Sequence, residues 1–301
     1  MVKELRDISG AGMSACKNAL VEAEGDIKRA TEILREKGLA AAAKKAGRIA
    51  AEGLVATAIS DCGKKGAIVE VNSETDFVAK NDDFVAFVKQ MAKEALNQDA
   101  STVDALLDSK WTPDPSQTAR DVLTHKIATI GENISVRRFE KYETTGRIVD
   151  YIHGGGRIGV MLEIASDDIS DEVVEAGRNC CMQIAAMSPQ YLDRSSVPAE
   201  YLKNEKEILT QQANNENAES DKPKPAQVIE KMIEGRLAKQ LKEVCLLDQE
   251  YVKDDKQTVA AYLKTVGKNT KIIRFTRYEK GEGIEKKEED FAAEVQKAMN
   301  V

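Results

Sequence analysis

An internal repeat constrains the fold of this chain more than any other feature. Residues 53–71 match residues 146–164 at a shift of 93 positions (146 − 53), and like residues pair throughout: Gly53/Gly146, Val55/Ile148, Ile59/Ile152, Gly63/Gly156, Gly66/Gly159, Glu70/Glu163 and Val71/Ile164. Apolar, β-branched runs that flank a glycine-containing turn are typical of a β-hairpin. The repeat therefore predicts two hairpins of the same design.

A second match supplies a third strand for each hairpin. Residues 131–143 pair with residues 267–279 at a shift of 136 positions (267 − 131). The common order of strand, strand, helices and strand predicts an α+β chain with two duplicated antiparallel three-stranded sheets. Each sheet should carry helices on one face.

Helical patterns lie between the second and third strands of both copies. In the second copy a helix is expected over residues 171–187, with Val174, Cys181, Ile184 and Ala185 inward, and Pro189 stops it. In the first copy the corresponding helix is expected to begin at an N-cap, either Asn81 or Asp82. The apolar face that follows has helical spacing and consists of Phe84, Phe87, Val88, Met91, Ala92, Ala95 and Leu96.

The first 38 residues predict a separate module of three short helices. After a helix over residues 3–8, Ser14 is expected to cap a second helix and Asp26 to begin a third; Gly38 ends the module. The second helix should bury Ala15, Cys16, Ala19, Leu20 and Ala23. By analogy, bundles of this size resemble the ubiquitin-associated (UBA-like) type. Residues 39–52 are rich in alanine and basic residues, which favours a helical linker.

The second copy is longer because it contains an inserted pair of charged helices. These are expected over residues 200–213 and 225–244, as a coiled-coil-like hairpin within residues 198–244. The sequence leaves its role open between a solvated arm, a second contact for a partner and a dimer interface. The apolar seam should consist of Leu202, Ile208, Leu209, Ile229, Ile233, Leu237 and Leu241.

The remaining residues complete a division into five units. Gly281 and Gly283 allow a turn, and Phe291, Val295 and Met299 have the spacing of a small amphipathic C-terminal helix. The predicted units are residues 1–38, 39–52, 53–143, 144–280 with the inserted hairpin, and 281–301.

Charge indicates which partners to expect. The net charge of −7 opposes attraction to a phosphate backbone, so direct nucleic-acid binding is disfavoured and a protein partner is favoured. Residues 1–50 contain ten basic and seven acidic residues, about +3, which leaves about −10 for the rest. Apolar runs are far shorter than the roughly 18 residues of a membrane span, and the charged first residues do not resemble a signal peptide. We therefore expect a cytoplasmic protein without membrane contact.

No catalytic motif is convincing. Gly154, Gly156 and Gly159 satisfy G-x-G-x-x-G, but a strand follows where a dinucleotide-binding motif needs a helix. His153 begins a stretch that imitates an esterase oxyanion loop, yet no G-x-S-x-G supplies a nucleophile, and no P-loop motif occurs. The five cysteines show no C-x-x-C spacing and are expected to be reduced and mostly packing residues. The sequence thus predicts neither an enzyme nor a cofactor or metal site.

The most informative segment for function is residues 70–81. An apolar strand ends in a polar turn, a helix follows, and Phe77 lies among the polar residues of that turn. An aromatic residue between a strand and a helix can belong to the core. The alternative is an exposed apolar wedge that inserts into a partner, as central aromatic residues of interfaces do. The sequence leaves both alternatives open.

Two segments resemble signatures of the elongation factor Ts family. Residues 70–80 read EVNSETDFVAK, and residues 5–20 read LRDISGAGMSACKNAL, with Ser9 where the family usually has threonine. The resemblance covers nearly the whole chain. It implies a guanine-nucleotide-exchange factor for the GTPase elongation factor Tu. The residues that match the Mg²⁺-dislodging turn of the family are Thr75, Asp76, Phe77 and Val78, with Phe77 as the wedge.

Further candidate contacts with the partner are Arg6, Met13, His153 and Phe291. Asp76 can either hold the turn or contact the partner's backbone. Two other classes of function compete with nucleotide exchange. An enzyme would use His153 with nearby carboxylates, although the chain has only two histidines. A non-catalytic scaffold that binds helices or ubiquitin-like proteins would use residues 1–38 as its main surface.

Overall fold

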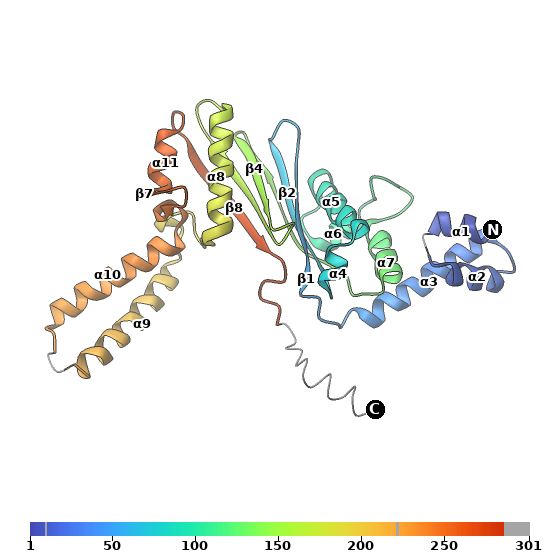
Figure 1. Ribbon diagram of the computed structural model, residues 1–301, viewed down its shortest axis with the longest axis horizontal. Coiled ribbons are helices and arrows are strands. Elements are labelled where there is room, and N and C mark those ends of the chain that lie inside the picture. Colours follow the sequence, from blue (N-terminus) through green and yellow to red (C-terminus); the bar gives the residue numbers. More distant parts are fainter. Residues whose placement is uncertain (10, 221–222, 286–301) are drawn as a thin grey trace.

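The computed structural model describes residues 1–9, 11–220 and 223–285, and their helices and small antiparallel sheets are those of an α+β chain (Figure 1). One sheet has the order β1-β2-β3 and another the order β4-β5-β8, so the second strand of each hairpin lies in the middle. Both middle strands shift register at equivalent places, between Glu70 and Val71 and between Glu163 and Ile164. The strands are β1 (Glu52–Ile59), β2 (Lys65–Ser73), β3 (Ser135–Glu143), β4 (Arg147–His153), β5 (Ile158–Ala165), β8 (Lys271–Glu279) and the small pair β6 (Glu250–Tyr251) and β7 (Asp254–Thr258).

Helices cover the outer face of each sheet. The predicted apolar face of residues 84–96 lies on β1 and β2, with Leu96 half-buried and the other members buried, and Asn81 is the N-cap. The helix over residues 171–187 covers β4 and β5 in the same way. The helices of these two layers are α4 (Asp76–Ala79), α5 (Asp82–Asn97), α6 (Val103–Asp108), α7 (Ala119–Ile130), α8 (Asp171–Met187) and α11 (Val259–Thr265).

The inner faces of the two sheets pack against each other. The Val55 N–H donates to the Gly156 carbonyl at 2.8 Å, and the Ile148 N–H donates to the Gly63 carbonyl at 2.8 Å. These two bonds exchange when each residue is moved by 93 positions, as contacts do across a two-fold axis. The apolar residues of this inner layer are Val55, Ile68, Tyr142, Ile148, Met161 and Tyr278, with Ile59 at its margin.

The N-terminal helices have a small core of their own but differ from expectation. The residue before the second helix is Gly12, without a side-chain cap, so Ser14 is not the cap, and Ala15 is exposed. Asp26 caps the third helix as predicted. The three helices are α1 (Val2–Ser9), α2 (Met13–Glu22) and α3 (Ile27–Lys45).

The third helix does not stop at Gly38, the expected end of the module. Helix α3 runs through Gly38 to Lys45 and packs against α7, where a Cβ on Gly38 would lie 3.8 Å from side-chain atoms of Ala128 and Thr124. The Arg35 guanidinium also pairs with Asp121 of α7 at 2.6 Å. A Cβ on Gly38 would make ordinary van der Waals contact, so the helix packing does not require glycine here. The helix continues through Gly38 despite the low helix propensity of glycine because α3 packs on α7. The expected linker is helical only as far as Lys45.

Helices α9 (Ala199–Ala218) and α10 (Ala226–Val244) run side by side and project from the sheets (Figure 1). Leu209, Ile233 and Leu241 are buried in the hairpin, but Ile208 is 48% exposed and does not belong to the seam. Consecutive helical positions point about 100° apart, so Ile208 and Leu209 cannot share the narrow face. Buried Ala213 packs in the seam beside Leu209.

Short 3₁₀ turns at η1 (Arg194–Ser196) and η2 (Leu246–Asp248) flank the hairpin. Gly281 and Gly283 form the predicted turn after β8, both with positive φ. The expected C-terminal helix with Phe291 lies outside the described residues. None of the described helices combines the length and hydropathy needed to cross a membrane.

Candidate functional site

Phe77 lies on the outside of the protein, on a helix of a single turn. Its side chain is 81% exposed, which rules out the interpretation of Phe77 as a core residue. The two residues that follow it in α4 point inward: Ala79 is buried and Val78 is half-buried against the core of the first sheet. Packing of Val78 and Ala79 therefore fixes the backbone of the turn, while the Phe77 ring points outward. We call residues 75–79 the Phe77 turn.

Thr75 and Glu132 hold the start of this turn. Thr75 is the N-cap, and its hydroxyl accepts from the Val78 N–H at 3.4 Å. One carboxylate oxygen of Glu132 accepts from the N–H groups of Glu74 and Thr75, both at 3.1 Å, and the other accepts from the Thr75 hydroxyl at 2.6 Å. Glu132 lies in the loop between α7 and β3, so a distant part of the chain supports the turn.

A second carboxylate links the same loop to the end of the linker. Glu74 accepts from the Asn133 N–H at 2.5 Å and lies 3.4 Å from the Arg48 guanidinium. The Asn133 side chain donates to the Arg48 carbonyl at 2.7 Å. The Phe77 turn, the α7–β3 loop and the segment after α3 are thus joined by hydrogen bonds.

The Asp76 side chain is partly exposed at the first position of α4. Its carboxylate faces solvent and pairs with Lys80 one helical turn further on, at 2.6 Å. The hydrogen bond from Lys80 lowers the pKa of Asp76, and the positive charges of Lys80 and Lys280 lower it further. Asp76 is therefore ionised near neutral pH and accessible to a partner.

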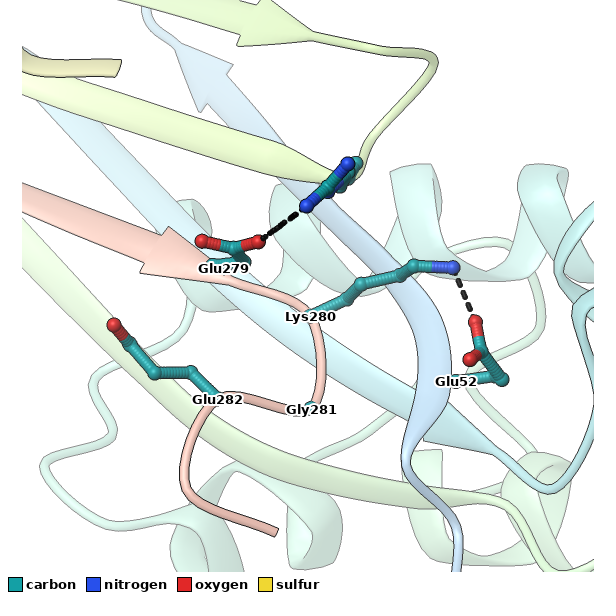
Figure 2. A pocket seen from close by; sticks show the side chains of 6 residues that line it. Glu52, Glu279, Lys280, Gly281 and Glu282 are labelled. Carbon is teal, nitrogen blue, oxygen red and sulfur yellow. Dashed lines mark hydrogen bonds and ion pairs between the residues drawn. The ribbon is translucent and has the colours of Figure 1, made fainter. Parts of the chain in front are cut away.

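An open hollow lined by charged side chains lies where the turn after β8 meets β1. Figure 2 shows Lys280 pointing toward Glu52 of β1. Glu279 pairs with the Arg157 guanidinium, which lies 3.1 Å away. The other lining residues are Gly281 and Glu282. The hollow is a network of ion pairs around the end of β8 and contains no serine, threonine or cysteine nucleophile.

Buried Glu70 anchors the turn that lines this hollow. Its carboxylate accepts from the Gly281 N–H at 2.8 Å and pairs with Arg138 at 2.6 Å and Arg137 at 3.1 Å. Arg137 also donates to the Glu282 carbonyl at 2.5 Å. The residues after β8 are therefore attached to the first sheet, against which α4 also lies.

The other predicted contact residues are spread over the molecule. His153 is exposed at the end of β4, and its Nδ1 lies 3.0 Å from the Tyr151 hydroxyl. Arg6 is exposed on α1, and Met13, the first residue of α2, is 53% exposed. Phe291 lies outside the described residues.

Sequence reasoning missed Glu132 and Asn133. They lie in loops without a motif, and Glu132 is 57 positions from Thr75 (132 − 75). No local signal identifies such partners, although a carboxylate beside the helix-ending Gly131 is a residue type that often accepts backbone hydrogen bonds.

Few side chains are arranged for metal or thiol chemistry. Within the described ranges, no three His, Cys, Asp or Glu side chains are grouped to hold a metal ion. All five thiols are free, and four of them are buried, which confirms the prediction that they are mostly packing residues. Cys62 is exposed, and a hydrogen bond with the Ser60 hydroxyl lowers its pKa.

Comparison with known proteins agrees with the resemblance seen in the two signatures. The family model described as Elongation factor TS matches residues 74–282. A relative named Elongation factor Ts from Clostridioides difficile is 51% identical over 303 residues, covering 99% of this chain and 97% of the relative. Relatives of the same name from Clostridium acetobutylicum, 53% identical over 306 residues (99% and 97% covered), and Clostridium perfringens, 52% identical over 301 residues (98% and 97% covered), are equally similar. This chain therefore belongs to the elongation factor Ts family of translation elongation factors.

Proposed function

We propose that this protein is a guanine-nucleotide-exchange factor that binds the translational GTPase elongation factor Tu and promotes GDP release. In this proposal the Phe77 turn displaces Mg²⁺ and the phosphate-side elements of the GTPase, and no covalent chemistry takes place. The observation that supports it most directly is the 81% exposed ring of Phe77 on a turn fixed by Thr75, Val78 and Ala79. Exposure of a large aromatic side chain on a fixed backbone is typical of an interface anchor.

Physical chemistry explains why such an anchor can release a nucleotide. A GTPase holds GDP through backbone amides on the phosphates and through Mg²⁺. An apolar ring that moves the Mg²⁺-side elements weakens both interactions at once. Because coupling between two ligands is reciprocal, GDP must weaken binding of this protein by the same factor by which this protein weakens GDP binding.

The experiment that tests the proposed function measures both sides of this coupling. The release rate and the equilibrium affinity of a fluorescent GDP on elongation factor Tu are measured with and without the protein, and the affinity of the protein for the GTPase is measured with and without GDP. We expect accelerated release and equal coupling factors. Unchanged release at saturating protein, with binding insensitive to GDP, would refute nucleotide exchange.

The N-terminal helices are proposed to be a UBA-like docking module rather than part of the displacement. Arg6 and the exposed Met13 are its candidate contacts. Deleting residues 1–34 keeps Arg35 and its pair with Asp121, so the part of α3 on α7 is retained. We expect weaker binding and a largely unchanged release rate at saturation.

The same deletion tests the alternative of a non-catalytic scaffold that binds helices or ubiquitin-like proteins. Such a scaffold would keep most of its partner affinity in the isolated N-terminal module, and the deleted chain would bind hardly at all. Among the other proposed contacts, His153 is exposed on β4, while the α9–α10 hairpin is proposed either to touch the partner or to form a dimer in the complex.

Metal dependence tests the role of Asp76. Raising the Mg²⁺ concentration should slow stimulated GDP release more steeply in Asp76→Asn than in the parent protein, because more metal must then be displaced by mass action alone. Lys80→Gln is the matched control, since it removes the partner of Asp76 and keeps the carboxylate. An identical Mg²⁺ dependence in Asp76→Asn and the parent protein would remove Asp76 from the mechanism.

A further inference from the structure

We propose that Glu132 is a positioning residue for Phe77, and that its carboxylate keeps the Phe77 turn in the orientation needed for nucleotide release. This inference rests on the proposed function. Glu132 acts through the turn and need not touch the GTPase, because its two oxygens are directed at Glu74 and Thr75.

The Phe77 turn needs such support because it is very short. Helix α4 has four residues, and an isolated helical turn is unstable because several dihedral angles are fixed for one hydrogen bond. The first N–H groups of a helix also lack partners within it. Glu132 gives the N–H groups of Glu74 and Thr75 an acceptor and fixes the hydroxyl of the capping residue. One side chain thus makes three of the bonds that define how the turn begins.

The charge of Glu132 suits this position. Hydrogen bonds to an ionised acceptor are about twice as strong as neutral ones, and a negative charge at the start of a helical turn is favourable. The side chain is half-buried, so water competes less for its oxygens than at a fully exposed site. Replacement by glutamine keeps the shape but removes the charge and turns one acceptor into a donor that faces other donors.

Glu132 also connects the turn to the helix that comes from the N-terminal module. It follows α7, and α7 packs on α3, where the Lys45 ammonium reaches the Ile127 carbonyl at 3.3 Å. Asn133, the next residue, bonds both Glu74 and Arg48. The orientation of Phe77 is therefore set by the same loop against which the end of the linker is fixed.

The chain offers a matched control in Glu94 of α5. Its carboxylate accepts from the Thr112 N–H at 3.2 Å and from the Thr112 hydroxyl at 2.7 Å, the same pair of donors that Thr75 presents to Glu132. Glu94 is buried, and it lies twelve residues (94 − 82) after the start of α5, about 18 Å along the helix from the α4 end. Glu94→Gln thus removes the same kind of interaction without touching the Phe77 turn.

The experiment compares the parent protein with Glu132→Gln, Glu94→Gln, Phe77→Ala and the double variant Glu132→Gln/Phe77→Ala. For each, the thermal midpoint, the saturating rate of fluorescent GDP release and the half-saturating concentration are measured. We expect Glu132→Gln to lower the saturating rate about 10-fold, the factor that loss of charge-assisted hydrogen bonds implies. Glu94→Gln should lower the thermal midpoint at least as much and leave the rate unchanged.

The double variant separates positioning from general stability. If Glu132 acts through the Phe77 ring, Glu132→Gln should not lower the release rate any further in a protein that already lacks the ring. The inference would be overturned if Glu132→Gln lowered the release rate by the same factor with and without the Phe77 ring. It would also be overturned if Glu132→Gln and Glu94→Gln released GDP at the same rate. If Glu132→Gln is unfolded at the assay temperature, Glu132→Asp is assayed by the same criteria. Failure of the parent protein to accelerate release would instead refute the proposed function itself.

Discussion

The two sheet-and-helix halves of this protein share a scaffold and differ in the segment after their middle strand. In the first half, β2 leads into the Phe77 turn, with the aromatic ring outside. In the second half the positions equivalent to residues 75–77 are Asp168, Ile169 and Ser170; Ile169 packs against the core and Ser170 caps α8. The paired sheets are common to both halves, whereas, at these equivalent described positions, an exposed aromatic ring is present in the first half alone. Connecting segments on a rigid scaffold are where binding residues usually lie.

The halves also differ at their equivalent buried carboxylates. Glu70 is fully buried, and its carboxylate pairs with Arg137 and Arg138 and accepts a hydrogen bond from the Gly281 N–H. Glu163 is 8% exposed and pairs with Arg274 at 2.7 Å and with the Thr144 hydroxyl. The additional partners of Glu70 attach the residues after β8 to the first sheet.

The largest expected effect on stability comes from removing the charge of these two carboxylates. Glu70→Gln should reduce the free energy of unfolding by about 3–5 kcal/mol, because two arginines lose a buried counter-charge. Glu163→Gln should cost only about 1–3 kcal/mol, since Arg274 remains partly in water. Urea unfolding of both variants measures the two costs. Equal costs would mean that the second arginine on Glu70 adds nothing to the stability of the first half.

A pair of glycines should give the next largest effect. Gly53 has φ +127°, and a Cβ on it would lie 2.1 Å from the Val71 carbonyl oxygen; at Gly146, without a positive φ, the distance to the Ile164 oxygen is 2.5 Å. We expect Gly53→Ala to destabilise the protein by about 3 kcal/mol or more and Gly146→Ala by about 1–3 kcal/mol. Thermal unfolding checks the order. A larger loss at Gly146 would contradict it.

A smaller effect concerns two tyrosines, each of which packs against an arginine of the other half. The Arg274 guanidinium lies 4.0 Å from the Tyr142 ring centre, and that of Arg138 lies 4.1 Å from the Tyr278 ring centre. Only the Tyr142 hydroxyl has a protein hydrogen bond within the part of the chain described, to Thr276 at 2.7 Å. Tyr142→Phe should therefore cost about 1 kcal/mol and Tyr278→Phe less than about 0.5 kcal/mol in denaturant unfolding. Similar costs would show that the hydrogen bond between the Tyr142 hydroxyl and Thr276 adds nothing to stability.

The smallest expected effect comes from His125 of α7. Burial lowers its pKa, and the charge of Lys126 lowers it further, so the folded protein binds the proton less readily than the unfolded chain. Stability should therefore fall as the pH drops below the unfolded value of about 6.5. In His125→Gln this part of the pH dependence should disappear, as thermal midpoints between pH 7.5 and 5.5 would show. An unchanged pH profile would remove His125 as its source.

Local patterns predict much of this fold. The hairpins, the third strands and the faces of α5 and α8 follow from alternation, helical spacing and the positions of glycine, which depend on nearby residues. Gly38 shows the limit of this reasoning: glycine often ends a helix, but α3 continues through Gly38 where it packs on α7. Those contacts involve residues more than 80 positions away, so no local pattern contains them.

The candidate site was predictable only in part. Its residue types and the resemblance identify Thr75 to Val78, yet they leave Phe77 undecided between core and surface. The orientation of a single helical turn decides it, because burial of Val78 and Ala79 places the Phe77 ring outside. Glu132, which supports that turn, comes from another loop and is found only in the folded structure.

The most direct test of the account is the Phe77→Ala variant, with two measurements on the same preparation. Since the side chain is 81% exposed, the free energy of unfolding should change by less than about 0.5 kcal/mol. Binding to the nucleotide-free GTPase should weaken by about 30- to 1000-fold, the usual range for a central aromatic anchor, and displacement of fluorescent GDP should slow accordingly. Val252→Ala, which truncates a 48% exposed residue in the second half, is the control and should change neither. A stable Phe77→Ala protein that displaces GDP at the parent rate would contradict the account.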